Sequence, residues 1–346
     1  MAEAVTLKEV AAEAGVHVST ASRALNPETR SVVNEKTAVR IIEVAERLGY
    51  RPHPLARGLR TNRTLTIGMV VPDLMNPLFP PIYAGAESVL ADHGYSLLVG
   101  TDDDDEAKSR SVIGALLERR VDGLILANAH RGFPPPTWRE TVPTVLVNRS
   151  VESQAFPAIV GDHHAGIGLA VEHLARLGHT VVAHIAGPQD LSTGLGRREG
   201  FVMAMEREGL DAPRDLIVEA EAFRIEAGRI ACEGLLDSGR QFTAIVAGND
   251  LIALGCYDAL GERGISIPDD LSITGYNDLR FIDRVFPPLT SISVDYREMG
   301  AVAARNLVGL VTAEQGPDES TFPLVELAPS LVVRASTAPP PEANRS

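Results

Sequence analysis

The chain has 346 residues, 45% hydrophobic and 23% charged, which suits two or three globular domains with large cores of their own. No apolar stretch approaches the roughly 18 residues that a membrane span needs, and the N-terminal residues include acids where an export signal would be basic. We therefore expect neither a membrane-spanning protein nor an exported one, but a cytoplasmic protein.

The formal net charge of −14 is distributed unevenly along the chain. Residues 1–60 contain nine Lys and Arg against seven Asp and Glu, which gives +2, and the rest carries −16. An acidic body disfavours unspecific adhesion to nucleic acid, whereas a small basic module can still bind phosphates locally. The asymmetry indicates that any nucleic-acid contact belongs to the N-terminal segment.

Three short helices are predicted within the first 50 residues. Thr6 and Glu9 form the S/T-x-x-E capping box of the first helix, and Gly15 interrupts the pattern as a tight turn requires. The second helix is predicted in VSTASRALN, where apolar residues again recur at helical spacing. The third helix is predicted to start after Asn34 and to end at Gly49. The predicted inner face of the third helix is Val39, Ile42, Ala45 and Leu48.

Beyond the helices, a linker leads into an alternation of strands and helices. The linker RPHPLARGLRTNRT holds one possible helical turn, LARGLR, too short to be stable in isolation. From Thr66 the chain alternates between strand and helix patterns, and a second such set begins at AIVGD, which predicts two α/β halves with parallel sheets. Ligands of such sheets bind beyond the carboxyl ends of the strands, so a site is expected in the cleft between the halves.

Several strings then carry a family resemblance. The segments TLKEVAAEAGVHVSTASRALN and LGYRPHPLARGLRTNRTLTIGMVVPDLMNPLF resemble the LacI/GalR family of bacterial transcription regulators almost position for position. The strings VDGLIL, AVEHLARLGH, TAIVAGNDLIALG, DLSITGYND and PPLTSI continue the match in family order to about residue 336. The resemblance implies an α/β protein with a three-helix helix-turn-helix headpiece and a two-lobed core similar to type I periplasmic binding proteins.

The resemblance also implies a function. It describes a repressor that binds palindromic operator DNA as a homodimer or tetramer and is controlled allosterically by a small polar metabolite, a sugar or sugar derivative. A repressor that needs a nucleoside or purine corepressor is the alternative. A sugar-binding transport component would share the core fold, but the headpiece and the absence of an export signal disfavour it.

The implied domain boundaries follow the segments already described. We expect the headpiece at 1–50, a hinge helix or linker at 51–63, an effector-binding and dimerisation core at 64–338, and a disordered tail at 339–346. The first lobe of the core is expected at 64–161 and 293–323, and the second lobe at 162–292 and 324–338.

In helix-turn-helix proteins the second helix lies in the major groove with its first residues at base edges. By resemblance, Val18, Ser19 and Arg23 read bases, and Thr20 and Ser22 contact phosphates or bases. Arg23 can bond guanine O6 and N7 together, and Val18 can pack on a thymine methyl; a solvated surface charge is the alternative for Arg23. The predicted DNA-binding set is Thr6, Val18, Ser19, Thr20, Ser22, Arg23, Asn26, Leu55, Ala56, Arg57, Leu59 and Arg60.

Two further features bear on DNA binding. LARGLR resembles the family's hinge helix, in which Leu59 would wedge into the minor groove, with Ala56 at the groove floor and Arg57 or Arg60 at the phosphates. An inert flexible linker is the alternative. His17 stands where the family usually has a serine that caps the recognition helix, so a capping loss of about 1 kcal/mol is expected.

A polar ligand site is predicted between the lobes. Arg197, in STGLGRREG, occupies the family's position for clamping a sugar hydroxyl or a carboxylate; an ion pair with Glu199 or Asp190 is the alternative. Asn148 and Asn277 replace acids common in relatives, which favours a neutral or negatively charged ligand over a cation. The predicted effector set is Asp73, Phe79, Asn148, Asp162, Thr193, Arg197, Phe223, Asn249 and Asn277, of which Phe79 and Phe223 could equally belong to the core.

The other residue patterns in the sequence predict no catalytic, metal-binding or nucleotide-binding site. No pair of histidines shows the HExxH pattern of a zinc site, and GLGRREG has the wrong spacing for a dinucleotide loop. Neither a GxSxG elbow nor a GxxxxGK loop occurs, so we expect no metal, no cofactor and no enzyme. Cys232 and Cys256 fit reduced core thiols, and the run DDDDE at 102–106 fits a solvated loop before a helix.

Overall fold

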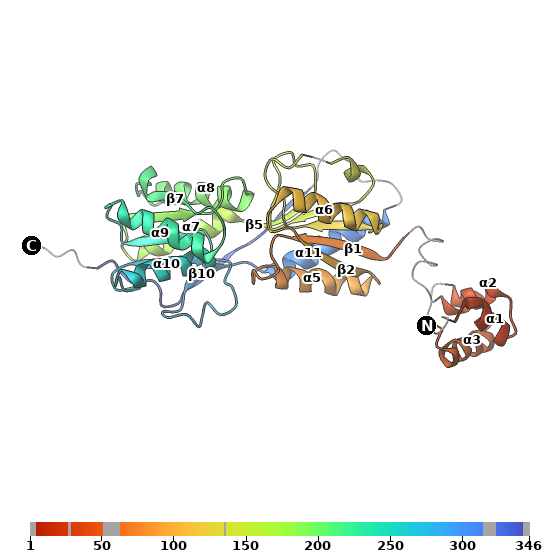
Figure 1. Cartoon of the computed structure of the whole chain (residues 1–346). Coiled ribbons are helices and arrows are strands. Elements are labelled where there is room, and N and C mark those ends of the chain that lie inside the picture. Colours follow the sequence, from red (N-terminus) through yellow and green to blue (C-terminus); the bar gives the residue numbers. More distant parts are fainter. Residues whose placement is uncertain (1–4, 27–28, 51–62, 135, 314–322, 342–346) are drawn as a thin grey trace, which may run out of the picture. The chain divides into compact units, whose positions relative to one another are not determined.

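The computed structural model describes residues 5–26, 29–50, 63–134, 136–313 and 323–341. The chain divides into two compact units, Met1–Leu65 and Thr66–Ser346 (Figure 1). The hinge prediction, with Leu55, Ala56, Arg57, Leu59 and Arg60, lies outside the described residues.

The first unit is a three-helix headpiece made of α1 (Leu7–Glu13), α2 (Val18–Leu25), a short 3-10 turn η1 (Arg30–Val32) and α3 (Glu35–Leu48). The predicted capping box is confirmed, because Thr6 Oγ1 accepts from Glu9 N while Thr6 N donates to Glu9 Oε2 at 2.6 Å. Gly15, at φ +61°, makes the turn between α1 and α2 in the left-handed region that glycine adopts without strain. Helix, turn and helix are therefore set by local residues.

The inner face of α3 differs from its prediction by one position. The buried residues are Ala38, Ile41, Val44 and Ala45, whereas Val39 is 50% exposed. Two apolar stripes run side by side along this helix, and both have helical spacing. Packing against α1 and α2 determines which of the two stripes is buried. The periodicity of α3 alone does not predict this packing.

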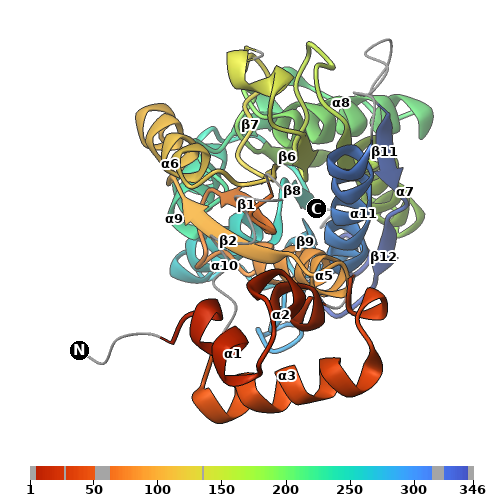
Figure 2. The same cartoon turned by 90° about the vertical axis from the view of Figure 1, so that its right-hand side faces the viewer.

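The first lobe of the second unit is a parallel sheet in the order β11-β5-β4-β3-β1-β2. Helix α6 (Glu106–Glu118) covers one face, and α5 (Phe79–Asp92) with α11 (Tyr296–Thr312) covers the other (Figures 1 and 2). A Cβ added at Gly85 would lie 1.8 Å from the Arg297 carbonyl oxygen, so glycine is required where α5 and α11 meet. The strands are β1 (Thr66–Val71), β2 (Ser96–Thr101), β3 (Gly123–Leu126), β4 (Thr144–Val147), β5 (Ala158–Gly161) and β11 (Leu324–Leu327).

The second lobe repeats this plan with the order β12-β10-β9-β8-β6-β7. Among its described pairs, β12 with β10 is antiparallel and the others are parallel. Helices α7 (His163–Arg176) and α8 (Ser192–Arg207) pack together, as do α9 (Ile225–Asp237) and α10 (Asp250–Glu262). The strands are β6 (Val182–Ala186), β7 (Ile217–Glu219), β8 (Ala244–Ala247), β9 (Ser272–Tyr276), β10 (Thr290–Ser293) and β12 (Ser330–Val332).

The chain crosses between the lobes three times, after β5, after β10 and after β11. The sequence analysis assigned 324–338 to the second lobe, but Leu324–Leu327 pairs in parallel with Ala158–Gly161 in the first sheet. The third crossing therefore lies between Leu327 and Ser330. Because β11 is a short edge strand, its own residues do not identify which sheet it joins.

The segment before the predicted tail is held firmly in the second lobe. Ser336 is buried, and the Ala338 carbonyl oxygen accepts from His179 Nε2 at 2.8 Å and from the Ser272 hydroxyl at 3.1 Å. Of the predicted tail at 339–346, residues 339–341 belong to the described structure, where Pro340 lies beside Gly178. Residues 342–346 are outside it.

A buried histidine in β6 makes the fold sensitive to acid. His184 stacks on Phe201 with ring centroids 4.8 Å apart, and its Nδ1–H donates to the Val246 carbonyl at 2.7 Å. Burial lowers the pKa of His184 to about 4. A depressed pKa means that this group favours the folded state above pH 6.5 and that the contribution is lost as pH falls toward 4.

We therefore expect that acidification from pH 6.5 to 4 costs the protein about 3 kcal/mol through His184 alone. The variant His184→Asn keeps a donor near Val246 but does not titrate. Chemical denaturation at both pH values should show a smaller acid-induced loss in the variant than in the wild type. Equal losses would mean that His184 does not carry this sensitivity.

Candidate functional site

Helix α2 presents a polar face to solvent. Ala21 and Ala24 are buried against the other headpiece helices, while Ser19 and Arg23, one turn apart, are exposed. The Arg23 guanidinium makes no hydrogen bond or ion pair with any described residue. The strongest predicted base reader is therefore available to an external acceptor.

The other described residues of the predicted DNA-binding set are more constrained. Thr6 is exposed, but its hydroxyl is occupied by Glu9 in the α1 cap. Val18 is half-buried and packs against the headpiece core, so its methyl groups serve the fold as well. Thr20, Ser22 and Asn26 are also half-buried; Asn26 caps the C-terminal end of α2.

His17 caps α2 in place of the family's serine. Its Nδ1 accepts from Ser19 N at 3.3 Å and lies 2.8 Å from Ser19 Oγ, so the expected loss of the cap does not occur in this geometry. Only a neutral imidazole can accept in this way.

We expect His17→Ala to destabilise α2 by about 1 kcal/mol at pH 7.5, because the backbone N–H of Ser19 in the first turn of the helix loses its acceptor. Hydrogen exchange of the α2 amides in the full-length protein measures this change. His17→Ser restores an acceptor and should restore protection, and unchanged exchange in His17→Ala would show that the cap contributes nothing.

A cleft of about 800 Å³ lies between the two lobes at the carboxyl ends of their strands. Eight of the nine predicted effector residues line it: Asp73, Phe79, Asn148, Thr193, Arg197, Phe223, Asn249 and Asn277. Asp162 does not; its carboxylate accepts from Ala165 N at 2.9 Å and caps α7. A polar residue at the start of a helix that directly follows a strand can either contact a ligand or cap the helix. The sequence alone does not distinguish these two roles.

Arg197 projects from α8 into the floor of the cleft and is 2% exposed. Its Nη1 donates to the Gly248 carbonyl at 2.7 Å and Nη2 to Asn277 Oδ1 at 3.3 Å. The guanidinium carbon lies 3.8 Å from the centroid of the Tyr276 ring and 5.5 Å from that of Phe223. The guanidinium is thus held in one orientation.

The alternative ion pairs for Arg197 are wrong. Glu199 faces His164 at 3.5 Å, and Asp190 bonds His130 at 2.8 Å. Nε of Arg197 is buried and has no hydrogen-bond partner among the described residues, and the same is true of Oγ1 of Thr193, one helical turn earlier. Buried polar atoms without partners are costly, so these two groups are candidates for contact with a ligand.

Burial also raises the pKa of two side chains beneath the cleft. It raises the pKa of Tyr276 to about 12, so the phenol under Arg197 is neutral at ordinary pH. It raises the pKa of Asp250, the first residue of α10, to about 7. The Asp250 carboxylate accepts from Leu279 N at 2.8 Å and from Ser291 Oγ at 2.5 Å, so it ties α10 to the loop after β9 and to strand β10.

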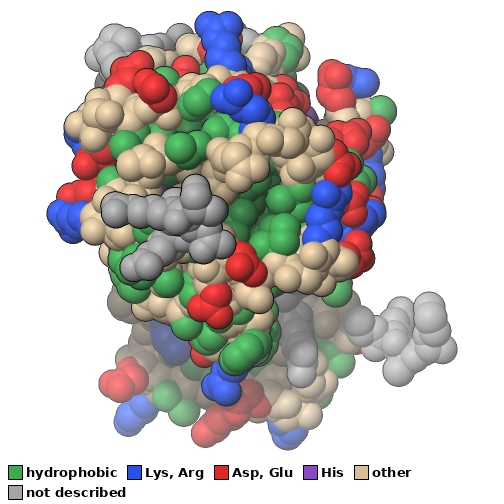
Figure 3. Space-filling model, turned by 90° about the vertical axis from the view of Figure 1, so that its left-hand side faces the viewer, with side chains coloured by type: hydrophobic (Ala, Val, Ile, Leu, Met, Phe, Trp, Pro, Cys, Tyr) green, Lys and Arg blue, Asp and Glu red, His purple; other side chains and the backbone are tan. Residues whose placement is uncertain are grey.

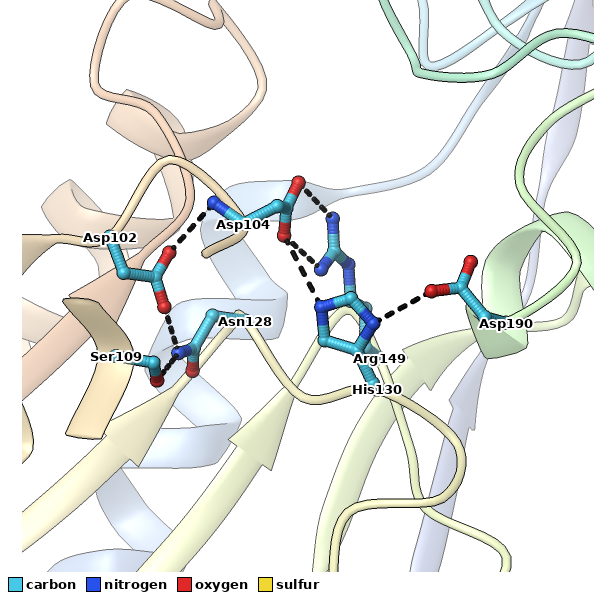
Figure 4. A network of polar contacts seen from close by, with 7 residues as sticks. All are labelled: Asp102, Asp104, Ser109, Asn128, His130, Arg149 and Asp190. Atoms are coloured by element: carbon cyan, nitrogen blue, oxygen red, sulfur yellow. Dashed lines mark hydrogen bonds and ion pairs between the residues drawn. The ribbon is translucent and has the colours of Figure 1, made fainter. Parts of the chain in front are cut away.

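A polar bridge between the lobes was missed by the sequence analysis. His130 stands between Asp104 of the first lobe and Asp190 of the second, and Arg149 donates to Asp104 at 2.6 Å (Figure 4). Arg131 adds a backbone bond from its N to the Asp190 carbonyl at 3.0 Å. Nothing in the local pattern of either segment signals the other, since the partners are about sixty residues apart.

The acidic run at 102–106 is more than the solvated loop that was predicted. Asp105 does cap α6 by accepting from Lys108 N at 2.7 Å. Asp104, however, belongs to the bridge between the lobes, and Asp102 is only 1% exposed.

Within the described ranges, no three His, Cys, Asp or Glu side chains come together as a metal ion would require, and no helix is both long and apolar enough to cross a membrane. Cys232 and Cys256 are free and buried, as predicted. On the face of the second unit in Figure 3, acidic and basic side chains are interspersed around apolar areas.

The headpiece and the two-lobed core together define a DNA-binding regulator with a ligand-binding body. Residues 6–53 match the model of bacterial regulatory proteins of the lacI family, and residues 171–337 match that of the periplasmic binding protein-like domain. The ribose operon repressor of Escherichia coli (strain K12) is 32% identical over 334 residues, which cover 96% of this chain and 99% of the repressor.

Solved structures agree with these matches. The lac repressor dimer bound to operator and the anti-inducer ONPF superposes with a TM-score of 0.81 at 26% identity, covering 97% of this chain and 100% of that one. A complex of the transcriptional regulator CelR with cellobiose has a TM-score of 0.73 at 29% identity, covering 96% and 99%. The chain belongs to the lacI family of bacterial regulatory proteins, and it is a DNA-binding transcriptional regulator, as its sequence predicted.

Proposed function

We propose that the protein is a repressor that binds palindromic operator DNA as a homodimer and whose operator affinity changes when a neutral sugar binds between its lobes. The observation that carries the proposal is a pair of buried groups at the floor of the cleft, Arg197 Nε and Thr193 Oγ1, which have no hydrogen-bond partner in the described part of the chain. A ligand with several hydroxyl groups would satisfy both.

The chemistry of the cleft favours a sugar over other small molecules. The cleft offers amide groups from Asn148, Asn249 and Asn277, which can donate to hydroxyl groups, and Phe79 and Phe223 supply apolar surface for a sugar ring. The volume of about 800 Å³ falls within the usual range of small-molecule sites and accommodates one or two rings. A relative named for ribose and a similar structure with cellobiose support this class of ligand.

The polar bridge between the lobes is one way in which ligand binding can affect operator binding. A ligand that contacts Arg197 on one lobe and Asn148 on the other alters how the lobes close, and the contacts of His130 and Arg131 with the second lobe must then adjust. The expected coupling between ligand and operator binding is about 1–3 kcal/mol, and it acts equally in both directions.

On the DNA side, we propose that Ser19 and Arg23 read bases, and that Val18, Thr20, Ser22 and Asn26 complete the contact with the duplex. Thr6 would contact a phosphate, and the hinge residues Leu55, Ala56, Arg57, Leu59 and Arg60 would bind the minor groove as the family resemblance implies. Because its target is chromosomal DNA, we place the protein in the cytoplasm.

A thermal-shift screen of pentoses, hexoses, disaccharides and nucleosides tests the ligand class. A ligand at 100 times its Kd adds about 2.7 kcal/mol of stability to the folded state. We expect one sugar to raise Tm selectively, and the same sugar to change the affinity for operator DNA. If nucleosides and not sugars raised Tm selectively, the effector would be a nucleoside and the sugar proposal would be wrong. If no compound raised Tm selectively, an effector of either class would be contradicted.

A further inference from the structure

A second cavity, of about 410 Å³, lies in the first lobe between α6 and the segments 128–134 and 136–138. Among the described residues that line the two hollows, it shares only Asp104 and His130 with the effector cleft. It is therefore a separate space on the other side of the bridge between the lobes.

The walls of this cavity are apolar and aromatic. Ile113 and Leu117 line it from α6, Leu126 lies at the end of β3, and Phe133 and Trp138 come from the covering segment. These side chains form one face of the hydrophobic core cluster of the lobe. Such a surface accommodates a flat apolar group of the size of one or two rings.

A buried carboxylate without a counter-charge also lines the cavity. The Asp102 side chain accepts from Asp104 N at 3.1 Å and from Asn128 Nδ2, which also donates to Ser109 Oγ at 2.7 Å (Figure 4). No Lys or Arg of the described chain pairs with Asp102. Both of its described donors are neutral amides.

The neighbouring acids differ from Asp102 in this respect. Asp103 pairs with Lys108, Asp104 with Arg149 and Glu106 with Arg110. Because a buried charge is stabilised by an ion pair and additional hydrogen bonds, Asp102 has the most to gain from a cation. At the rim, Asp105 adds a negative charge, whereas the charge of Glu106 is neutralised by Arg110, which also lines the cavity.

We propose that this cavity is a second ligand site, which binds a small arylalkyl amine. The ring lies against Trp138 and Phe133, and the ammonium group donates to the Asp102 carboxylate. An aromatic body and one cationic end match the two kinds of surface that the cavity offers. This ligand differs in class from a neutral sugar, and the proposal does not rest on the function proposed for the effector cleft.

Trp138 makes the proposal directly testable, because it is the only tryptophan in the chain. Titrating the full-length protein with phenethylamine at pH 7 should change the tryptophan emission saturably. The neutral analogue 2-phenylethanol should bind on the order of tenfold more weakly, because it lacks the charge-assisted hydrogen bond. Equal affinity for the two probes, or no saturable change with the amine at millimolar concentrations, would overturn the proposal.

Three variants sharpen the test. Asp102→Asn should abolish the preference for the amine, whereas Asp105→Asn, which removes an acid at the rim and keeps a capping residue on α6, should retain it. Gly114→Leu places a side chain where an added Cβ meets nothing within 4 Å, on the α6 face that lines the cavity. It should fill the cavity and abolish the response without lowering Tm, since leucine also favours the helix. An unchanged response in Gly114→Leu would show that the probe binds elsewhere.

Discussion

Replacing Arg23 with alanine is expected to weaken binding to the preferred genomic fragment by about 10- to 100-fold, while weak, salt-sensitive binding to random duplex persists. The reason is geometric. Arg23 projects from the exposed face of α2 and has no partner among the described residues, so its guanidinium can make two parallel bonds to one guanine. Phosphate contacts made by other residues are unaffected, and these contacts dominate unspecific binding.

Arg47→Ala is the matched control, because Arg47 is an exposed arginine of the same headpiece that pairs with Glu13 at 3.0 Å. It removes the same charge from α3 and should change the ratio of specific to unspecific affinity little. The measurement is a fluorescence-anisotropy titration of both duplexes at two salt concentrations. Unchanged operator affinity in Arg23→Ala would remove Arg23 from the reading set.

Replacing Arg197 with alanine is expected to abolish the response to the effector, weakening effector binding by about 100-fold or more, with little change in operator affinity without ligand. Three lost interactions contribute to this effect. The ligand loses a charge-assisted hydrogen bond worth about 1.5–3 kcal/mol, and Asn277 loses the donor that holds its amide in place. Tyr276 also loses the cation stacked on its ring at 3.8 Å.

Arg198→Ala is the matched control, because this arginine is the next residue of α8 and is exposed. Arg197→Lys separates charge from shape, since lysine keeps the charge but lacks the planar fork and Nε; we expect it to bind effector almost as weakly as the alanine variant. Calorimetric titration of the effector selected by thermal shift, with and without operator DNA, measures both quantities. An effector affinity in Arg197→Ala equal to that of the wild type would show that the ligand binds elsewhere.

Most of the fold was predictable because it is encoded locally. The capping box at Thr6, the glycine turn at Gly15 and the alternation of strands and helices each depend on residues a few positions apart. The predicted effector positions at strand ends converge for the same reason, since parallel strands end at one edge of a sheet. Asp162 is the exception, since it caps α7 and does not line the cleft.

The features that were not predicted depend on contacts between distant segments. Both stripes of α3 are apolar, and the headpiece core selects the one that includes Ile41. The strand β11 joins the first sheet because its neighbour is β5, more than 160 residues earlier. Asp102 and His130 acquire their environments from loops that approach each other only in the folded lobes, and His17 caps α2 because its ring nitrogen reaches a backbone amide.

The most direct test of the account is a selection of genomic fragments by the purified full-length protein, followed by titration of the best fragment with and without the sugar found by thermal shift. The account predicts that the selected duplex binds at least about 1,000-fold more tightly than random duplex at physiological salt, and that the sugar changes this ratio. Binding that does not distinguish any genomic fragment from random duplex, in either condition, would contradict it.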